Sequence, residues 1–168
     1  DIAGRLDETA WSAATPSGEF TESYPRPGQA PRDGTEFRVL YDDQALYVGI
    51  RMFDSHPDSI VAGLARRDAT AATGIYSDWV HLIIDSYHDR RTAFRFSTTP
   101  RSVQKDVYTY NDGNENINWD AVWEVASRVD SVGWVSEYRI PLSQLRYGSS
   151  PAGAERQWEF QVMRDVAR

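Results

Sequence analysis

The feature that most constrains this chain is the alternation of apolar and polar side chains in the stretch Asp78–Thr98. Two alternating runs are separated by Asp85–Arg91, which is almost entirely polar, and this pattern predicts a β-hairpin. The residues expected on its buried face are Val80, Leu82, Ile84, Phe94 and Phe96. Because a slip of one residue would turn every side chain over, we expect Leu82 to lie near Phe94, and His81 to lie opposite Arg95 on the other face.

The same alternation recurs and predicts a second hairpin, Thr35–Tyr41 and Ala45–Phe53, joined by the turn Asp42-Asp43-Gln44. Other predicted strands are Val103–Tyr110, Trp119–Ala126, Gly133–Ile140 and Gln157–Arg164, with one more around Glu19–Ser23 in the Pro-rich segment Ser12–Gly34. Ser59–Arg66 fits a strand or a short helix, Asp68–Ser77 a loop, and Pro141–Tyr147 a helical turn. Short strands at regular spacing predict an all-β fold, an immunoglobulin- or jelly-roll-like antiparallel β-sandwich of about nine to ten strands.

Composition narrows the possible functions. A chain of 168 residues fits a single domain, here residues 1–168, and we expect it to be part of a longer protein because it begins with Asp1 and its last predicted strand reaches the end. A net charge of −7 argues against nucleic acid as a partner. The absence of cysteine excludes disulfides and thiolate nucleophiles. Since no catalytic motif is present, we expect the protein not to be an enzyme; catalysis of glycoside hydrolysis would need two carboxylates about 5–10 Å apart in a cleft.

The face of the sheet that points away from the core is the candidate binding site. If the late strands share a sheet with the central hairpin, this face presents His81, Arg95, Glu137 and Gln161, whose planar groups suit bonds with vicinal hydroxyls. Tyr76 and Trp119, in adjoining loops, are expected to form aromatic walls for a sugar ring. The alternative from periodicity alone is a solvated sheet face with a weak Arg95–Glu137 salt bridge.

Calcium is the metal that the sequence suits best. Asn111–Asn116 places several oxygen-bearing side chains in one predicted turn, as calcium sites require. Asp42-Asp43 together with Asp54 is a second candidate. Asn, Asp and Gly also form turns without a metal, so the metal ligands stay open at this point.

An ordered series of segments covers nearly the whole chain: GRLDETAW, TEFRVLYDDQALYVGIRMFD, SDWVHLIIDSYHDRRTAFRFSTTP, WDAVWE, GWVSEYRIPLSQLRY and WEFQVMRDVAR. This series resembles the carbohydrate-binding module family 9-like domain that stands at the N-terminus of a group of bacterial outer-membrane-associated proteins. In that group a C-terminal region, expected to be a membrane β-barrel, follows the domain.

The resemblance implies a β-sandwich, export to the periplasm, outer membrane or cell surface, an oligo- or polysaccharide ligand, and structural calcium. In characterised members of the broader family, two tryptophans clamp a sugar while polar side chains bond its hydroxyls. By motif position, Arg95 and Gln161 match sugar-contacting residues, whereas His81 stands where those members tend to have an acid. Ile75-Tyr76 lies near the place of the first tryptophan.

The sequence therefore leads to two functional hypotheses. The first is a noncatalytic carbohydrate-binding module of an exported bacterial protein, with its saccharide on one sheet face. The alternative is a structural or interaction domain that caps the C-terminal membrane region and binds no sugar. A contiguous apolar patch on the same face would favour the alternative.

Overall fold

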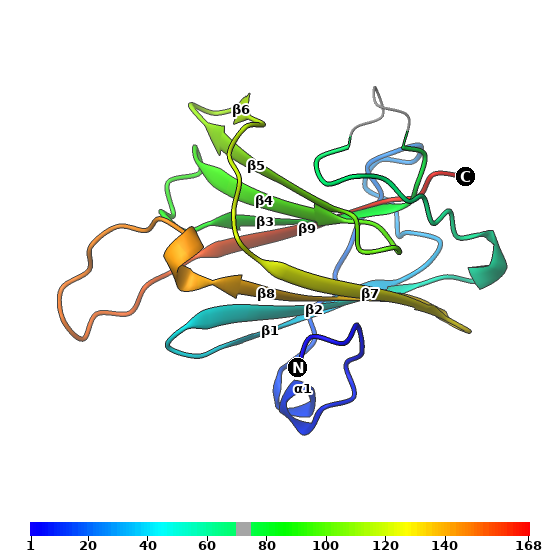
Figure 1. Cartoon of the computed structure of the whole chain (residues 1–168), viewed down its shortest axis with the longest axis horizontal. Helices are drawn as coiled ribbons and strands as arrows, with labels where there is room; N and C mark the ends of the chain where they lie inside the picture. The colour runs from blue at the N-terminus through cyan, green and yellow to red at the C-terminus, as the bar shows by residue number, and fades with distance from the viewer. Residues whose placement is uncertain (70–74) are drawn as a thin grey trace.

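The computed structural model describes residues 1–69 and 75–168, which form two antiparallel sheets packed face to face (Figure 1). Sheet A has the strand order β1-β2-β8-β7, and sheet B the order β6-β5-β4-β3-β9. The strands are β1 (Thr35–Tyr41), β2 (Ala45–Phe53), β3 (Trp79–Asp85), β4 (Ala93–Thr98), β5 (Gln104–Tyr110), β6 (Asn114–Asn116), β7 (Glu124–Asp130), β8 (Gly133–Pro141) and β9 (Glu159–Asp165). Three short helices, α1 (Thr9–Ala13), η1 (Pro57–Ser59) and η3 (Leu142–Gln144), complete the described elements. The prediction of an antiparallel β-sandwich is confirmed.

The core lies between the sheets and is built from the alternating positions that the sequence assigns to it. Val80, Leu82 and Ile84 of β3 are fully buried, and one apolar cluster joins them to Trp134 and Tyr138 of β8 in the opposite sheet. Burial of this apolar surface is the main favourable contribution to folding. The alternation therefore leaves every second side chain of β3 on the outer face of sheet B.

The register of the central hairpin differs from the prediction by two residues. Leu82 pairs with Phe96 rather than Phe94, and His81 pairs with Ser97 rather than Arg95, which lies opposite Ile83. The Asp85 carboxylate accepts hydrogen bonds from the backbone N–H groups of Asp89 and Arg90 and closes the loop between the strands. A shift of two residues leaves every side chain on its predicted face, so alternation cannot distinguish the two registers.

Other predicted elements agree in part. The hairpin Thr35–Tyr41 and Ala45–Phe53 is confirmed with its bounds, whereas the segment Glu19–Ser23 is not a strand. The strand predicted at Trp119–Ala126 begins only at Glu124, because the preceding residues pack into the core as an irregular segment. The remaining differences are that Ser59–Arg66 forms neither strand nor α-helix, that Pro141–Tyr147 contains the short helix η3, and that residues 70–74 of the predicted loop Asp68–Ser77 lie outside the described residues.

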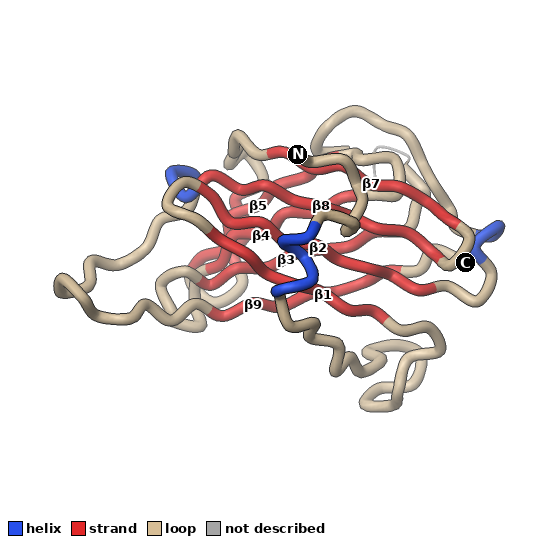
Figure 2. Tube along the Cα trace, turned by 90° about the horizontal axis from the view of Figure 1, so that it is seen from below, coloured by secondary structure: helices blue, strands red, loops and turns tan. Residues whose placement is uncertain are grey.

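The N-terminal segment, residues 1–14, lies across the outer face of sheet A (Figures 1 and 2). Trp11 is buried, and Leu6 packs over Gly49, where a Cβ atom would lie 2.4 Å from the Leu6 Cδ2 atom. Leu6 and Trp11 therefore hold the segment on the outer face of sheet A. Within the described residues, no helix is both long and apolar enough to cross a membrane.

A buried ion-pair network holds the C-terminal end of β9. The Arg168 guanidinium donates to both Asp54 carboxylate oxygens at 2.7 and 2.8 Å, and Arg164 donates to the same carboxylate at 3.3 Å. The Asp78 carboxylate accepts the backbone N–H of Ala167 at 2.9 Å. These bonds join β9 to the ends of β2 and β3 and fix where its last residues lie.

Candidate functional site

The outer face of sheet B brings together polar side chains from β9, β3, β4 and β5. The strand register arranges them in two rows across the sheet. Row one is Gln161, Ile83, Arg95 and Val107; row two is Met163, His81, Ser97 and Lys105. His81, Arg95 and Gln161, which the sequence assigns to one face, therefore lie on neighbouring positions of that face.

Arg95 is held at the centre of this face. Its Nη2 atom lies 3.0 Å from Oε1 of Glu115 on β6, and its side chain is 25% exposed. Its Nε atom is buried and has no hydrogen-bond partner in the described part of the chain. The Gln161 side chain is exposed and forms no hydrogen bond within the described residues. Gln161 and the exposed part of the Arg95 guanidinium are therefore open to a ligand on either side of Ile83, whereas the Arg95 Nε atom is covered.

His81 is engaged at both ring nitrogens. Its Nδ1 atom lies 2.7 Å from the Ser97 hydroxyl, and its Nε2 atom lies 3.0 Å from Oδ2 of Asp165. The Trp79 ring stacks on the His81 ring with a centroid distance of 6.1 Å and an interplanar angle of 10°. The hydrogen bond from His81 lowers the pKa of Asp165, and this effect outweighs the opposing effect of burial.

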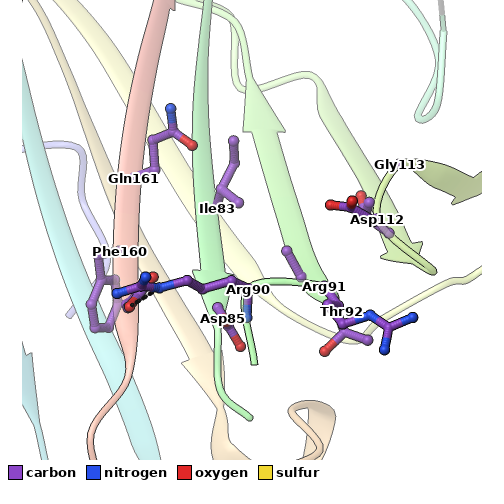
Figure 3. Close-up of a pocket in the computed structure, with 12 residues that line it drawn as sticks. Ile83, Asp85, Arg90, Arg91, Thr92, Asp112, Gly113, Phe160 and Gln161 are labelled. Atoms are coloured by element: carbon purple, nitrogen blue, oxygen red, sulfur yellow. Dashed lines mark hydrogen bonds and ion pairs between the residues drawn. The ribbon is translucent and has the colours of Figure 1, made fainter. Parts of the chain in front are cut away.

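A cavity of about 380 Å³ adjoins row one at the tip of the central hairpin (Figure 3). Ile83 and Gln161 belong both to its lining and to row one, so the cavity borders that row, although Arg95 itself is not part of the lining. On its rim the Arg90 Nε atom lies 3.2 Å from Oε1 of Glu159. Asp89 accepts the backbone N–H groups of Arg91 and Thr92 and so fixes the loop that carries Arg90.

Tyr76, one of the two predicted aromatic walls, is 63% exposed. Its hydroxyl donates to the carbonyl of Ala167, two residues beyond Asp165. The side chain therefore reaches the C-terminal end of β9, toward the Asp165 end of the outer face rather than toward the cavity.

Two predicted site residues lie elsewhere. Glu137 stands on β8, which pairs with β2 and β7 in sheet A, so the expectation that it shares a face with Arg95 is wrong. Its carboxylate, 2% exposed, accepts hydrogen bonds from the N-terminal segment. Arg95 pairs with Glu115 instead.

Trp119 is likewise not a wall of the outer face. Its ring lies 5.0 Å from the Phe94 ring and 5.8 Å from the Phe96 ring, centroid to centroid, and both phenylalanines point into the core. Trp119 therefore closes one end of the core.

The two candidate calcium sites differ in how far their oxygens are engaged. In the second candidate, Asp54 is already bonded by two arginines, and Asp42 accepts the backbone N–H groups of Gln44 and Ala45. Such oxygens do not suit a cation. Asn111–Asn116 consists of an exposed turn, residues 111–113, and β6 itself, whose Glu115 pairs with Arg95; a calcium ion there stays a prediction. Within residues 1–69 and 75–168, no group of three or more His, Cys, Asp or Glu side chains could hold a metal ion.

Sequence reasoning missed four residues of this face: Trp79, Ser97, Glu115 and Asp165. The alternation itself places Trp79 beside His81, and Ser97 beside Arg95, so a signal for both was present. Asp165 lies one residue past the predicted last strand, and Glu115 lies in the predicted turn. Their contacts with His81 and Arg95 join segments that are distant in sequence, and no local pattern indicates them.

Comparison with known proteins identifies the fold and the family of this chain. The fold is similar to that of a family 9 carbohydrate-binding module from Caldicellulosiruptor kristjanssonii in complex with cellotriose, with a TM-score of 0.59 and 18% identity over 96% of this chain and 71% of that chain. A complex of such a module from the same organism with glucose gives a TM-score of 0.58 and 19% identity over 96% of this chain and 72% of that chain.

A protein from Bacteroides uniformis ATCC 8492 has a similar fold, with a TM-score of 0.64 and 10% identity over 91% of this chain and 72% of that chain. At these identities the similarity concerns the fold. No curated protein matches the chain. The profile of the carbohydrate family 9 binding domain-like family matches residues 2–165. The chain therefore belongs to the carbohydrate family 9 binding domain-like family.

Proposed function

We propose that this chain is a noncatalytic carbohydrate-binding module that binds an oligo- or polysaccharide on the outer face of sheet B. The observation that carries the proposal is the pair Arg95 and Gln161, which flank Ile83 on this face, with Gln161 exposed and the Arg95 side chain 25% exposed. A hydrogen bond from a charged donor to a ligand oxygen contributes about 1.5–3 kcal/mol, so this pair can hold a polar ligand.

The neighbouring groups suit a sugar. Vicinal hydroxyls present donors and acceptors in one plane, and a guanidinium next to a primary amide can bond both kinds of atom. Arg95 and Gln161 stand on either side of Ile83, an apolar surface on which the C–H face of a sugar ring can pack. The adjoining cavity of about 380 Å³ falls within the usual size range of small-ligand sites.

The alternative, a structural domain without a sugar site, would be favoured by a contiguous apolar patch on this face. Instead the face carries Arg95, Gln161 and Asp165 around the exposed apolar side chain of Met163. This arrangement supports the binding module, and the binding experiment below decides between the two.

The cellular setting belongs to the same proposal. We infer export to the periplasm, outer membrane or cell surface, and a C-terminal membrane-associated region as a partner within the full-length protein. The resemblance in the ordered sequence segments supports both inferences. We also propose calcium as a structural ion, with its ligands left open and Asn111–Asn116 as one candidate segment.

Calorimetric titration with cellotriose and glucose, followed by a glycan array, tests the proposal. We expect Arg95→Ala to weaken saccharide binding by about tenfold or more, and Arg128→Ala, an exposed arginine on sheet A, to leave it unchanged. A parallel titration in EDTA tests the calcium prediction. If the folded wild-type domain bound no saccharide on the array, the proposal would be overturned and the structural domain favoured.

A further inference from the structure

We propose that Asp165 is the carboxylate on this face that accepts hydroxyl groups of a neutral saccharide, and that His81 is a positioning residue acting through it. This inference rests on the proposed function and names its ligand class and a second contact. Its site is the end of the outer face where Asp165 of β9 pairs with Trp79 of β3, away from the hairpin-tip cavity.

The protein itself occupies both ring nitrogens of His81. An ionised carboxylate only accepts hydrogen bonds, so the Nε2 atom, 3.0 Å from Asp165 Oδ2, carries the proton in the neutral ring. The Nδ1 atom is then an acceptor, and Ser97 donates its hydroxyl to it at 2.7 Å. With both nitrogens engaged and its side chain 17% exposed, His81 has no polar atom to spare for a ligand.

The Asp165 carboxylate, in contrast, keeps acceptor positions that no described residue occupies. One carboxylate has about four lone-pair positions, and the His81 bond occupies one of them. The Asp165 side chain is 63% exposed, and within the described residues it has no other hydrogen-bond partner. His81 therefore orients a carboxylate whose remaining acceptor positions face solvent.

The position of Asp165 is built into the fold. Its neighbour Arg164 points the other way, 8% exposed, and bonds the buried Asp54. Two residues beyond Asp165, the backbone N–H of Ala167 is held by buried Asp78. Because side chains alternate along a strand, locking Arg164 inward directs Asp165 outward.

The surroundings of Asp165 fit a neutral sugar ring. The stacked rings of Trp79 and His81 lie beside it, and the exposed Met163 side chain is on the row of His81. The exposed Met163 side chain suits the C–H face of a pyranose while Asp165 accepts from its hydroxyls, and Trp79, packed against Ile75 and Val103, supports the His81 ring. A sugar that carries its own carboxylate at this position would be repelled.

Electrostatics agree with the geometry. The hydrogen bond from His81 lowers the pKa of Asp165 more than burial raises it, and the positive charge of Arg95 lowers it further, so the pKa lies below its ordinary value of 3.8 and Asp165 stays ionised near neutral pH. The groups that lower this pKa are thus His81 from β3, through its hydrogen bond, and Arg95 from β4.

The test compares glucose with glucuronate, two probes that differ in one carboxylate. We expect Asp165→Asn to weaken glucose binding by roughly tenfold and to narrow the preference for glucose over glucuronate. Asp43→Asn, at an exposed aspartate in the β1–β2 turn, is the matched control and should change neither quantity.

Two conservative variants distinguish a role of His81 in orienting Asp165 from a purely structural role. His81→Gln can keep an N–H near the Nε2 position and should retain glucose binding. The shorter side chain in His81→Asn reaches only toward Ser97, so this variant should lose as much glucose affinity as Asp165→Asn does. NMR titration of the Asp165 carboxyl should show its pKa rising toward 3.8 in His81→Asn and staying low in wild type.

The outcomes distinguish this inference from the proposed function. Loss of binding in Arg95→Ala with unchanged binding in Asp165→Asn would overturn the role of Asp165 and leave the binding module standing. Equal losses in His81→Gln and His81→Asn would overturn the positioning role of His81. If the folded wild-type domain bound neither probe and no saccharide on the glycan array, both proposals would be overturned.

Discussion

The Glu137 carboxylate holds the N-terminal segment on sheet A, and its removal should release that segment. Glu137 is buried and accepts the backbone N–H groups of Ala3 and Gly4 at 2.9 and 3.0 Å, and the Trp11 indole N–H at 3.3 Å. Hydrogen bonds to a charged group contribute about 1.5–3 kcal/mol each. Water can satisfy the released amides, so we expect Glu137→Ala to reduce the docking free energy by roughly 3 kcal/mol rather than by the sum.

Hydrogen exchange is the appropriate assay, because docking and global unfolding give different signals. A loss of roughly 3 kcal/mol corresponds to about a hundredfold faster exchange of the Ala3 and Gly4 amides. The amides of β3 in the core of sheet B should keep their protection. Glu137→Gln retains one acceptor oxygen and should fall between wild type and Glu137→Ala.

The control is Glu124→Ala, which removes an exposed glutamate from the neighbouring strand of sheet A. It should leave exchange of the N-terminal amides unchanged, because an exposed ion pair contributes little. Unchanged protection of Ala3 and Gly4 in Glu137→Ala would refute the reasoning. Loss of protection throughout the chain would show that Glu137 stabilises the whole domain instead.

Three further perturbations follow from the packing. Gly49→Ala should displace Leu6 and loosen the N-terminal segment, so the amide hydrogens of that segment should exchange faster with little change elsewhere. A segment that keeps its full protection would contradict this prediction. Arg67→Ala should lower the free energy of unfolding in urea by about 3 kcal/mol, because it leaves the buried Asp106 carboxylate without the guanidinium 2.6 Å away. Adding Asp106→Asn should recover part of that loss, and fully additive effects of the two substitutions would count against the ion pair. Burial raises the pKa of Asp78, so the contribution of this carboxyl group to stability is fully present below about pH 3.8 and is lost as pH rises through the raised pKa. The free energy of unfolding of Asp78→Asn should therefore increase relative to that of wild type between pH 4 and pH 7 in urea melts, and a constant difference would contradict this.

Much of the fold could be predicted from local sequence. The hairpin Thr35–Tyr41 and Ala45–Phe53 was predicted with its bounds, because alternation and a polar turn are properties of neighbouring residues. For the same reason, His81, Arg95 and Gln161 were assigned to the correct face. Side chains of a strand alternate between two faces whatever the strand pairs with, so this information is carried by the strand itself.

Which strands become neighbours was decided by the tertiary structure. Backbone hydrogen bonds between strands are nearly independent of side-chain identity, so alternation in β8 could not show that Glu137 belongs to sheet A. The contact between His81 and Asp165 spans 84 residues and exists only because β9 pairs with β3. The sequence by itself determined which side chains avoid the core; the packing of the two sheets decided which of them meet, and so where a saccharide would find its partners.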